Sequence, residues 1–291
     1  MSFYRLVYLV FFVSLFCVSC SKTPSETLKS WGSSLGLSNE LEEDPIDQTL
    51  NLKDRSAIRK YYDRGQYIVT SVSACGICHG SRPKDPTSPL SGGREVYGIK
   101  ASNITSDNQT GVGLWSVKEL VNSIRFNKSK DGSVIRKGVH ANYSWLSDFD
   151  TKAIVTFLLA SEPVKKRISK ESSKWDLDIF SSSAKVKGYI PQYTPSATEQ
   201  YGRYLTHNVA GCVSCHSSSL EQDDLFSGKD YGGSFPIGGP DIREIKDIQS
   251  FLSKGKKSNG NKVDPYICPQ EYFKNMTNVD KQAIELYLKK F

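Results

Sequence analysis

The chain has 291 residues, of which 38% are hydrophobic and 24% are charged. This composition excludes a disordered, collagen-like or multi-span membrane chain, and the length suits two soluble domains of roughly 100 to 150 residues each. The net charge of +7 arises from 38 basic and 31 acidic residues spread along the chain. Because no basic block stands out, we expect no nucleic-acid partner.

The N-terminal residues have the pattern of an export signal. Arg5 precedes an uncharged apolar run of about fifteen residues, which is too short to span a bilayer. The run ends at Cys17-Val18-Ser19-Cys20 and turns polar at once. It resembles the lipobox of bacterial lipoproteins, although Cys17 stands where Leu is usual. We predict a signal peptide at 1–19, acylation of Cys20 and a periplasmic protein that is lipid-anchored to a membrane; ordinary cleavage and an uncleaved anchor are the alternatives.

Four of the seven cysteines lie in two motifs of identical pattern. These are Cys75-Gly76-Ile77-Cys78-His79 and Cys212-Val213-Ser214-Cys215-His216. Both are C-x-x-C-H, the attachment sequence of c-type haem, in which two thiols bond the vinyl groups of one porphyrin and the histidine binds iron. A redox dithiol, a disulfide or half of a zinc site is the alternative for one such motif, but two in an exported chain favour haem. We predict two covalently bound haem c groups, with His79 and His216 as proximal iron ligands and Cys75, Cys78, Cys212 and Cys215 as attachment residues.

The sequence around the two motifs repeats at a nearly constant offset. Matching segments are Gly65 to Tyr67 and Gly202 to Tyr204, Lys118-Glu119-Leu120 and Lys246-Asp247-Ile248, Asp131-Gly132 and Asn259-Gly260, and Ser147-x-x-Asp150 and Thr277-x-x-Asp280. The last pair is typical of helix caps, and Ser196-Ala197-Thr198-Glu199 predicts a capping box at the start of the second copy. The chain therefore holds two copies of one helical unit.

Each unit resembles a class I cytochrome c domain, with an N-terminal helix that runs into the motif, a middle helix, a distal-ligand loop and a C-terminal helix. The first unit resembles more closely the dihaem and trihaem cytochrome c subunits associated with membrane alcohol dehydrogenases, through Pro89-Leu90-Ser91-Gly92-Gly93, Ser102-Asn103-Ile104-Thr105, Thr110-Gly111-Val112-Gly113-Leu114-Trp115-Ser116 and Gly138-Val139-His140. The resemblance implies an all-α fold of two tandem domains, each a small helical bundle around a covalent haem. We predict a polar tether at 20–53, domain 1 at 54–162, a linker at 163–195 and domain 2 at 196–291.

The sixth iron ligands depart from the usual pattern. Most class I cytochromes use methionine, but Met276 is the one methionine of this chain besides Met1. His140 and Cys268 correspond at the same offset that relates Lys118 to Lys246, in the loops where sixth ligands are expected. We predict that His140 binds the first iron and Cys268 the second, which gives potentials below those of His/Met cytochromes.

Alternatives exist at each of these positions. Met276 falls opposite Leu146, immediately before the last helix, where core packing is expected. It is nevertheless the next candidate ligand if Cys268 is an unpaired buried thiol. His140 has a surface or hydrogen-bonded loop position as its alternative. His207 lies shortly before the second motif, on the proximal side that already has a histidine.

These patterns favour electron transfer between redox partner proteins of the periplasm or membrane. The alternative is a haem enzyme of sulfur oxidation, since cysteine-ligated c-type haem resembles that of thiosulfate dehydrogenase, although the cysteine candidate here lies in the second unit. A dihaem peroxidase needs an open iron position, against which two sixth-ligand candidates argue. A gas or redox sensor is a further alternative, and whether the chain is a catalyst stays open.

Overall fold

The computed structural model describes residues 55–96, 99–135, 140–169, 190–219, 221–228, 238–243, 245–256, 260–263 and 268–291. The predicted signal peptide, Cys20, the tether and most of the linker lie outside these described residues. The predicted helical class is confirmed in the described part, where the exception is a two-stranded antiparallel pair of β1 (Glu95–Val96) and β2 (Ile99–Lys100). No helix in these ranges is both long enough and apolar enough to cross a bilayer.

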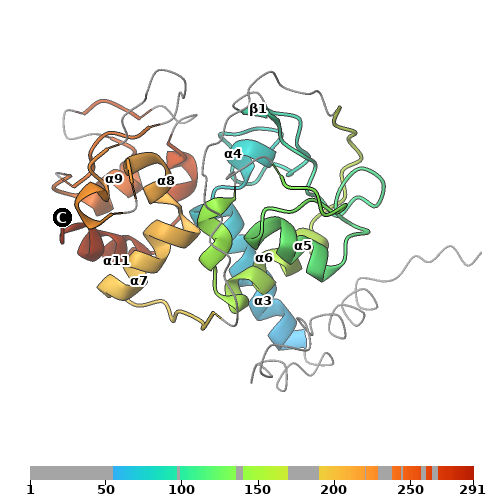
Figure 1. Ribbon diagram of the computed structural model, residues 1–291, viewed down its shortest axis with the longest axis horizontal. Helices are drawn as coiled ribbons and strands as arrows, with labels where there is room; N and C mark the ends of the chain where they lie inside the picture. Colours follow the sequence, from blue (N-terminus) through green and yellow to red (C-terminus); the bar gives the residue numbers. More distant parts are fainter. Residues whose placement is uncertain are drawn as a thin grey trace, which may run out of the picture.

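The order of helical elements occurs twice along the chain (Figure 1). The first repeat consists of α3 (Arg55–Tyr67), η1 (Ile68–Val72), α4 (Gly76–His79), α5 (Val117–Arg125), η2 (Ala141–Trp145) and α6 (Asp148–Ala160). The second repeat consists of α7 (Glu199–Tyr204), η3 (Leu205–Val209), α8 (Cys212–His216), η4 (Gln222–Asp224), α9 (Ile248–Lys254), α10 (Gln270–Phe273) and α11 (Asn278–Leu288). Here η1 and η3 are π-helical turns, and η2 of the first repeat corresponds to α10 of the second.

A close helix crossing forms the frame of each repeat. The first helix packs on the last, α3 on α6 and α7 on α11, as Figure 1 shows. A Cβ atom at Gly65 would collide with the Ala153 carbonyl oxygen, and one at Gly202 would collide with that of Ala283. The glycine of each Gly-x-Tyr segment is therefore required for the two backbones to approach.

Both predicted caps of the last helices are confirmed. Ser147 Oγ accepts a hydrogen bond from the Asp150 N–H at 3.1 Å, at the start of α6. Thr277 Oγ1 accepts one from the Asp280 N–H at 3.2 Å, at the start of α11. Each cap satisfies a backbone donor that the helix itself leaves free, and each fixes an aspartate in the first turn.

The predicted capping box at Ser196 is wrong. Helix α7 begins further along, where Thr198 has an extended backbone and its Oγ1 accepts from the Tyr201 N–H at 3.3 Å. Ser196 Oγ instead donates to the Thr194 carbonyl oxygen at 3.2 Å. Two hydroxyl residues stand close together here, and the one nearer the helix provides the cap.

The tyrosine of the first Gly-x-Tyr segment bonds to the other repeat. Tyr67 Oη donates to the Asp280 carboxylate and accepts from the Thr277 N–H at 2.9 Å. Tyr67, at the end of α3, thus contacts the N-terminus of α11 across the boundary between the repeats. Burial and the neighbouring Asp280 charge raise the pKa of Tyr67, so its hydroxyl stays protonated as a donor.

The second tyrosine makes the reciprocal contact. Tyr204 Oη donates to Asp150 Oδ2 at 2.7 Å and accepts from the Ser147 N–H at 3.1 Å. Arg64 adds two bonds to the same carboxylate, Nε to Oδ1 at 2.8 Å and Nη2 to Oδ2 at 3.0 Å. Since each repeat gives a tyrosine and receives one, the boundary has an approximate two-fold symmetry.

We predict that Tyr67→Phe and Tyr204→Phe each lower the free energy of unfolding by about 1–3 kcal/mol, because each leaves a buried carboxylate with one donor fewer. Urea unfolding followed by circular dichroism measures the change. The matched control is Tyr62→Phe, which keeps the ring contact with Phe157 and should leave stability unaltered. Variants as stable as the unsubstituted protein would show that the reciprocal contacts carry no net energy.

Candidate haem sites

A π-helical turn precedes each C-x-x-C-H motif. After η1 the chain turns through Ala74, which has a φ of +50°, and after η3 it turns through Gly211, with a φ of +65°. A left-handed conformation is strained for a residue such as Ala74 and is often found at functional sites. The motifs then form the short helices α4, which has Cys75 as its N-cap residue, and α8, and the three-residue spacing places the two cysteines of each motif on one face.

Two histidine rings lie close together at the first motif. The ring centroids of His79 and His140 lie 6.4 Å apart, and the ring planes are inclined by 40°. His79 Nδ1 lies 2.7 Å from the Ser102 carbonyl oxygen, and His140 Nδ1 lies 3.0 Å from that of Ser123. Since Nδ1 donates to a carbonyl in both rings, each Nε2 keeps the lone pair that a metal ion needs.

The spacing of these rings fits a metal ion between them. Imidazole nitrogen binds a first-row metal at about 2.0 Å, so two opposed imidazoles on one ion have centroids roughly 6 Å apart. Burial lowers the pKa of His79 to about 4, an effect that the Ser102 carbonyl partly offsets, and burial also lowers the pKa of His140. Both rings are therefore neutral at pH 7, the state in which histidine binds metals.

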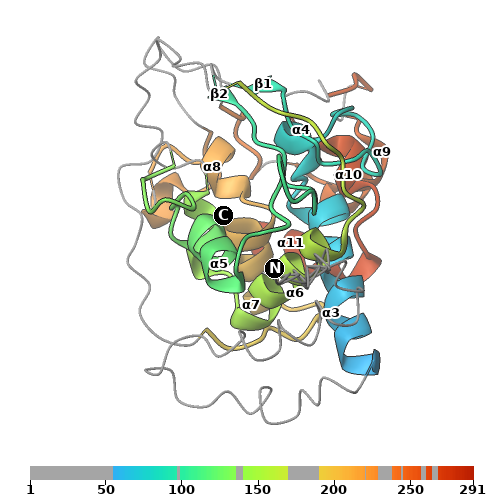
Figure 2. The ribbon, with the colours of Figure 1, turned by 90° about the vertical axis from the view of Figure 1, so that its right-hand side faces the viewer.

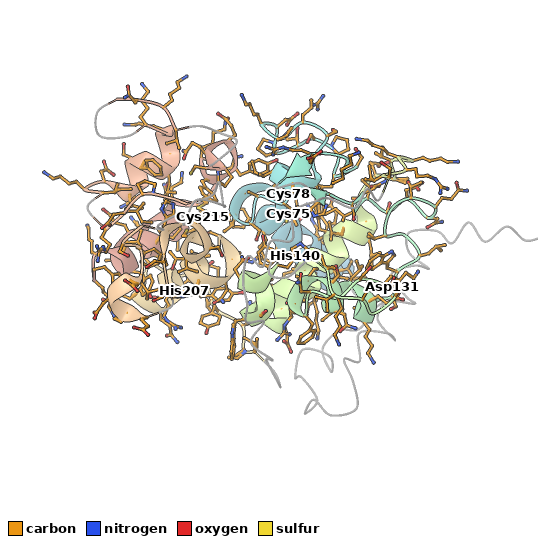
Figure 3. The ribbon with its side chains drawn as sticks, turned by 45° about the horizontal axis from the view of Figure 1, so that its top comes forward. Cys75, Cys78, Asp131, His140, His207 and Cys215 are labelled. Atoms are coloured by element: carbon orange, nitrogen blue, oxygen red, sulfur yellow. The ribbon has the colours of Figure 1, made fainter. Side chains whose placement is uncertain are left out.

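The cysteines of the first motif lie beside these rings. Figure 3 labels Cys75 and Cys78 in the first repeat; both are charge neighbours of Tyr143, whose ring centroid lies 5.7 Å from that of His140. Burial, with a smaller contribution from Cys78, raises the pKa of the Cys75 thiol to about 12. None of the five cysteines in the described ranges is in a disulfide, so both thiols are available for a covalent attachment. The first site thus joins the donor pair and the thiols that haem c requires.

The second motif has a proximal histidine of the same kind and a cysteine as its neighbour. His216 Nδ1 lies 2.8 Å from the Pro240 carbonyl oxygen. Burial raises the pKa of the Cys268 thiol to about 12, and the nearby Cys215 adds to this increase. Cys268 in turn adds to the raised pKa of Cys212. The fold therefore brings Cys268 next to the second pair of thiols, although it is distant from them in sequence.

Two other sequence candidates are engaged in packing: Met276 is buried, and His207 is half-buried. Met276 is 4% exposed and lies in the hydrophobic core, as does Leu146, its counterpart in the first repeat. His207 Nε2 lies 2.9 Å from Tyr287 Oη, and its ring packs edge-on against Phe226. These contacts support a packing role for both residues.

Two residues lie near the first motif although nothing in the sequence predicts that they do. Arg94 donates to the Ile77 carbonyl oxygen, and its positive charge opposes the burial that raises the pKa of Cys78. Tyr272 comes from the second repeat, yet its charge neighbours include the motif cysteines. A repeat pattern identifies equivalent positions within the units but does not indicate which side chains cross between them.

Comparison with known proteins gives distant relatives, three of which are cytochrome subunits of dehydrogenases. No family model matches the chain. The cytochrome c subunit of gluconate 2-dehydrogenase from Pantoea cypripedii is 24% identical over 273 residues, covering 82% of this chain and 61% of the relative. The fructose dehydrogenase cytochrome subunit of Gluconobacter japonicus is 24% identical over 261 residues, covering 80% and 53%. The cytochrome c subunit of alcohol dehydrogenase (quinone) from Gluconobacter oxydans is 25% identical over 168 residues, covering 53% and 34%.

These relatives are cytochrome c subunits of dehydrogenases. Their similarity supports electron transfer and covalently bound haem c, in agreement with the two motifs. The chain spans about half to three fifths of the length of the first two relatives.

The pH dependence of stability tests the packed position of His207. Burial, with a smaller effect of Arg203, lowers its pKa to about 4 in the folded protein, whereas in the unfolded chain it takes up a proton near pH 6.5. Neutral His207 therefore contributes to the free energy of unfolding above pH 6.5. This contribution is lost as the pH falls toward 4, and after solvent screening the loss is on the order of 1–2 kcal/mol. Unfolding free energies at pH 7 and pH 4.5 should show a smaller decrease in His207→Gln. An equal decrease in both proteins would contradict the assignment.

Proposed function

We propose that this chain is a dihaem c-type cytochrome that transfers electrons between redox partner proteins. The observation that carries the proposal is the pair of neutral, closely spaced imidazoles of His79 and His140 beside the thiols of Cys75 and Cys78. The relatives named above support it, since each is a cytochrome subunit of a dehydrogenase.

The attachment residues follow from the two motifs. Cys75 and Cys78 would hold one haem c, and Cys212 and Cys215 the other. When bound, haem c supplies an iron that carries one electron at a time. The chain contributes His79 and His216, whose Nδ1 atoms are held by the Ser102 and Pro240 carbonyls so that Nε2 is presented.

The sixth ligands that we propose are His140 and Cys268. Their correspondence rests on the loop before them, because the isolated bridges Lys128 to Val134 and Lys256 to Lys262 recur at the offset that relates His140 to Cys268. A thiolate or imidazole in place of methionine favours the ferric state, so both potentials should lie below those of His/Met cytochromes. Bound ferric iron would also hold the Cys268 sulfur as thiolate, against the burial that otherwise keeps the thiol protonated.

The arrangement of the whole chain follows from the repeat. We take residues 54–162 and 196–291 as two tandem cytochrome domains, a division that the repeated element order supports. We also take the protein to be periplasmic and anchored to a membrane by lipid on Cys20, which rests on the sequence pattern of residues 1–22. The partners would then be an electron-donating dehydrogenase, as for the relatives, and a periplasmic or membrane acceptor.

One observation favours a second function. Cys268 lies next to the second motif, and a thiolate-ligated haem is also what a sulfur-oxidising enzyme would use. Turnover of thiosulfate in a steady-state assay would favour that enzyme, whereas its absence, with rapid electron exchange, favours the carrier.

The number of haems tests the proposal. Mass spectrometry of the denatured, exported protein should show two covalent haem additions, and the same spectrum would report acyl chains on Cys20. The double variants Cys75→Ser/Cys78→Ser and Cys212→Ser/Cys215→Ser should each lose one haem and keep the other, because each motif holds its own group. Cys268→Ser is the matched control and should keep both. A wild-type chain without covalent haem would contradict the proposed function.

A further inference from the structure

The hydroxyl of Tyr272 has no partner in the described chain. Tyr272 lies in α10 of the second repeat and is completely buried. Its Oη atom is buried as well and makes no hydrogen bond. Because a buried donor without an acceptor destabilises the folded state, an acceptor is expected near it.

This hydroxyl lies against the first haem motif, although Tyr272 belongs to the other repeat. A Cβ atom at Gly76 would collide with Tyr272 Oη and would lie 3.1 Å from its Cζ. Burial raises the pKa of Tyr272, and Cys75 makes the largest of the charge contributions that add to this increase. Figure 2 shows α10 beside α4, in agreement with the packing of α10 on η1, the turn that leads into the first motif. The small residue between the two motif cysteines therefore makes room for a phenol group.

The counterpart of Tyr272 on the other side of the boundary is satisfied within the chain. Asn142 corresponds to Tyr272 at the offset that relates Ser147 to Thr277, and its Nδ2 would lie 2.6 Å from a Cβ atom at Gly211, just before the second motif. Its amide donates to the Asn208 carbonyl oxygen at 3.2 Å. Asn142 thus has a backbone acceptor. The hydroxyl of Tyr272, by contrast, lies against the first motif and has no acceptor in the described chain.

We propose that Tyr272 donates a hydrogen bond to the haem group attached at Cys75 and Cys78, so that the second repeat completes the first haem site. The inference rests on the proposed function, since the acceptor comes with the attached group. A donor at this position favours the more electron-rich ferrous state and raises the potential of the first haem. Tyr272 also lies four residues after Cys268, so the segment that contains α10 carries a candidate group for each haem.

The test removes one oxygen atom. In Tyr272→Phe the ring still fills its place, and we expect the potential of the first haem to shift downward while that of the second stays constant. A redox titration followed by electron paramagnetic resonance resolves the two haems, and the ferric ligand signature of each should be unaltered. Tyr201→Phe is the matched control, because Tyr201 is as deeply buried but has Arg64 and Asp280 as its charge neighbours, and it should shift neither potential.

Two results would overturn the inference. If the wild-type protein carries two haems and Tyr272→Phe has the same first potential as Tyr201→Phe, the hydroxyl has a packing role alone. If the wild-type protein carries no covalent haem, the proposed function fails and this contact fails with it. A measurement on the unsubstituted protein makes the test independent of the variant: proton NMR should show a Tyr272 hydroxyl proton that exchanges slowly and is shifted by the ferric iron. A rapidly exchanging, unshifted proton would contradict the contact.

Discussion

The exchange of tyrosine–aspartate contacts between the repeats is the constraint on which the rest of the structure depends. Tyr67 and Tyr204 each end a first helix and each bond to the start of the other repeat's last helix. This arrangement brings η2 against η3 and α10 against η1, the turns that lead directly into the motifs. These turns are thereby held at the boundary, so packing between the repeats positions the segments that lead into both motifs.

The two sites differ within this symmetric frame, and the differences have consequences for electron transfer. A histidine in the first repeat is replaced by Cys268 in the second, and Asn142 is replaced by Tyr272. Arg64, which binds the buried Asp150, has Tyr201 as its counterpart. Two haems in these sites would have unlike potentials, because axial ligands and nearby hydrogen bonds both tune the iron. A repeat with unlike sites gives electrons a preferred direction, which two identical sites could not do.

Local sequence chemistry predicted the parts that depend on short spacing. The haem motifs and the caps at Ser147 and Thr277 concern residues whose roles follow from near neighbours. Sequence did not show that Tyr67 and Tyr204 bond across the boundary, because a tyrosine at a helix end has the same local pattern whether it contacts its own repeat or the other. Sequence likewise did not show that Tyr272 lies against the first motif, because its local pattern does not indicate which repeat it contacts. The misplaced cap at Ser196 reflects two hydroxyl residues competing for one helix start.

The electron paramagnetic resonance spectrum of the fully oxidised protein tests the central claim, that each repeat holds a six-coordinate haem with its own distal ligand. Two low-spin ferric signals of equal intensity are expected, one typical of two imidazoles and one of imidazole with thiolate. Cys268→Met should remove the second signal and keep the first, and His140→Met should do the reverse. A single signal, or high-spin iron in either site, would contradict two six-coordinate haems with unlike distal ligands.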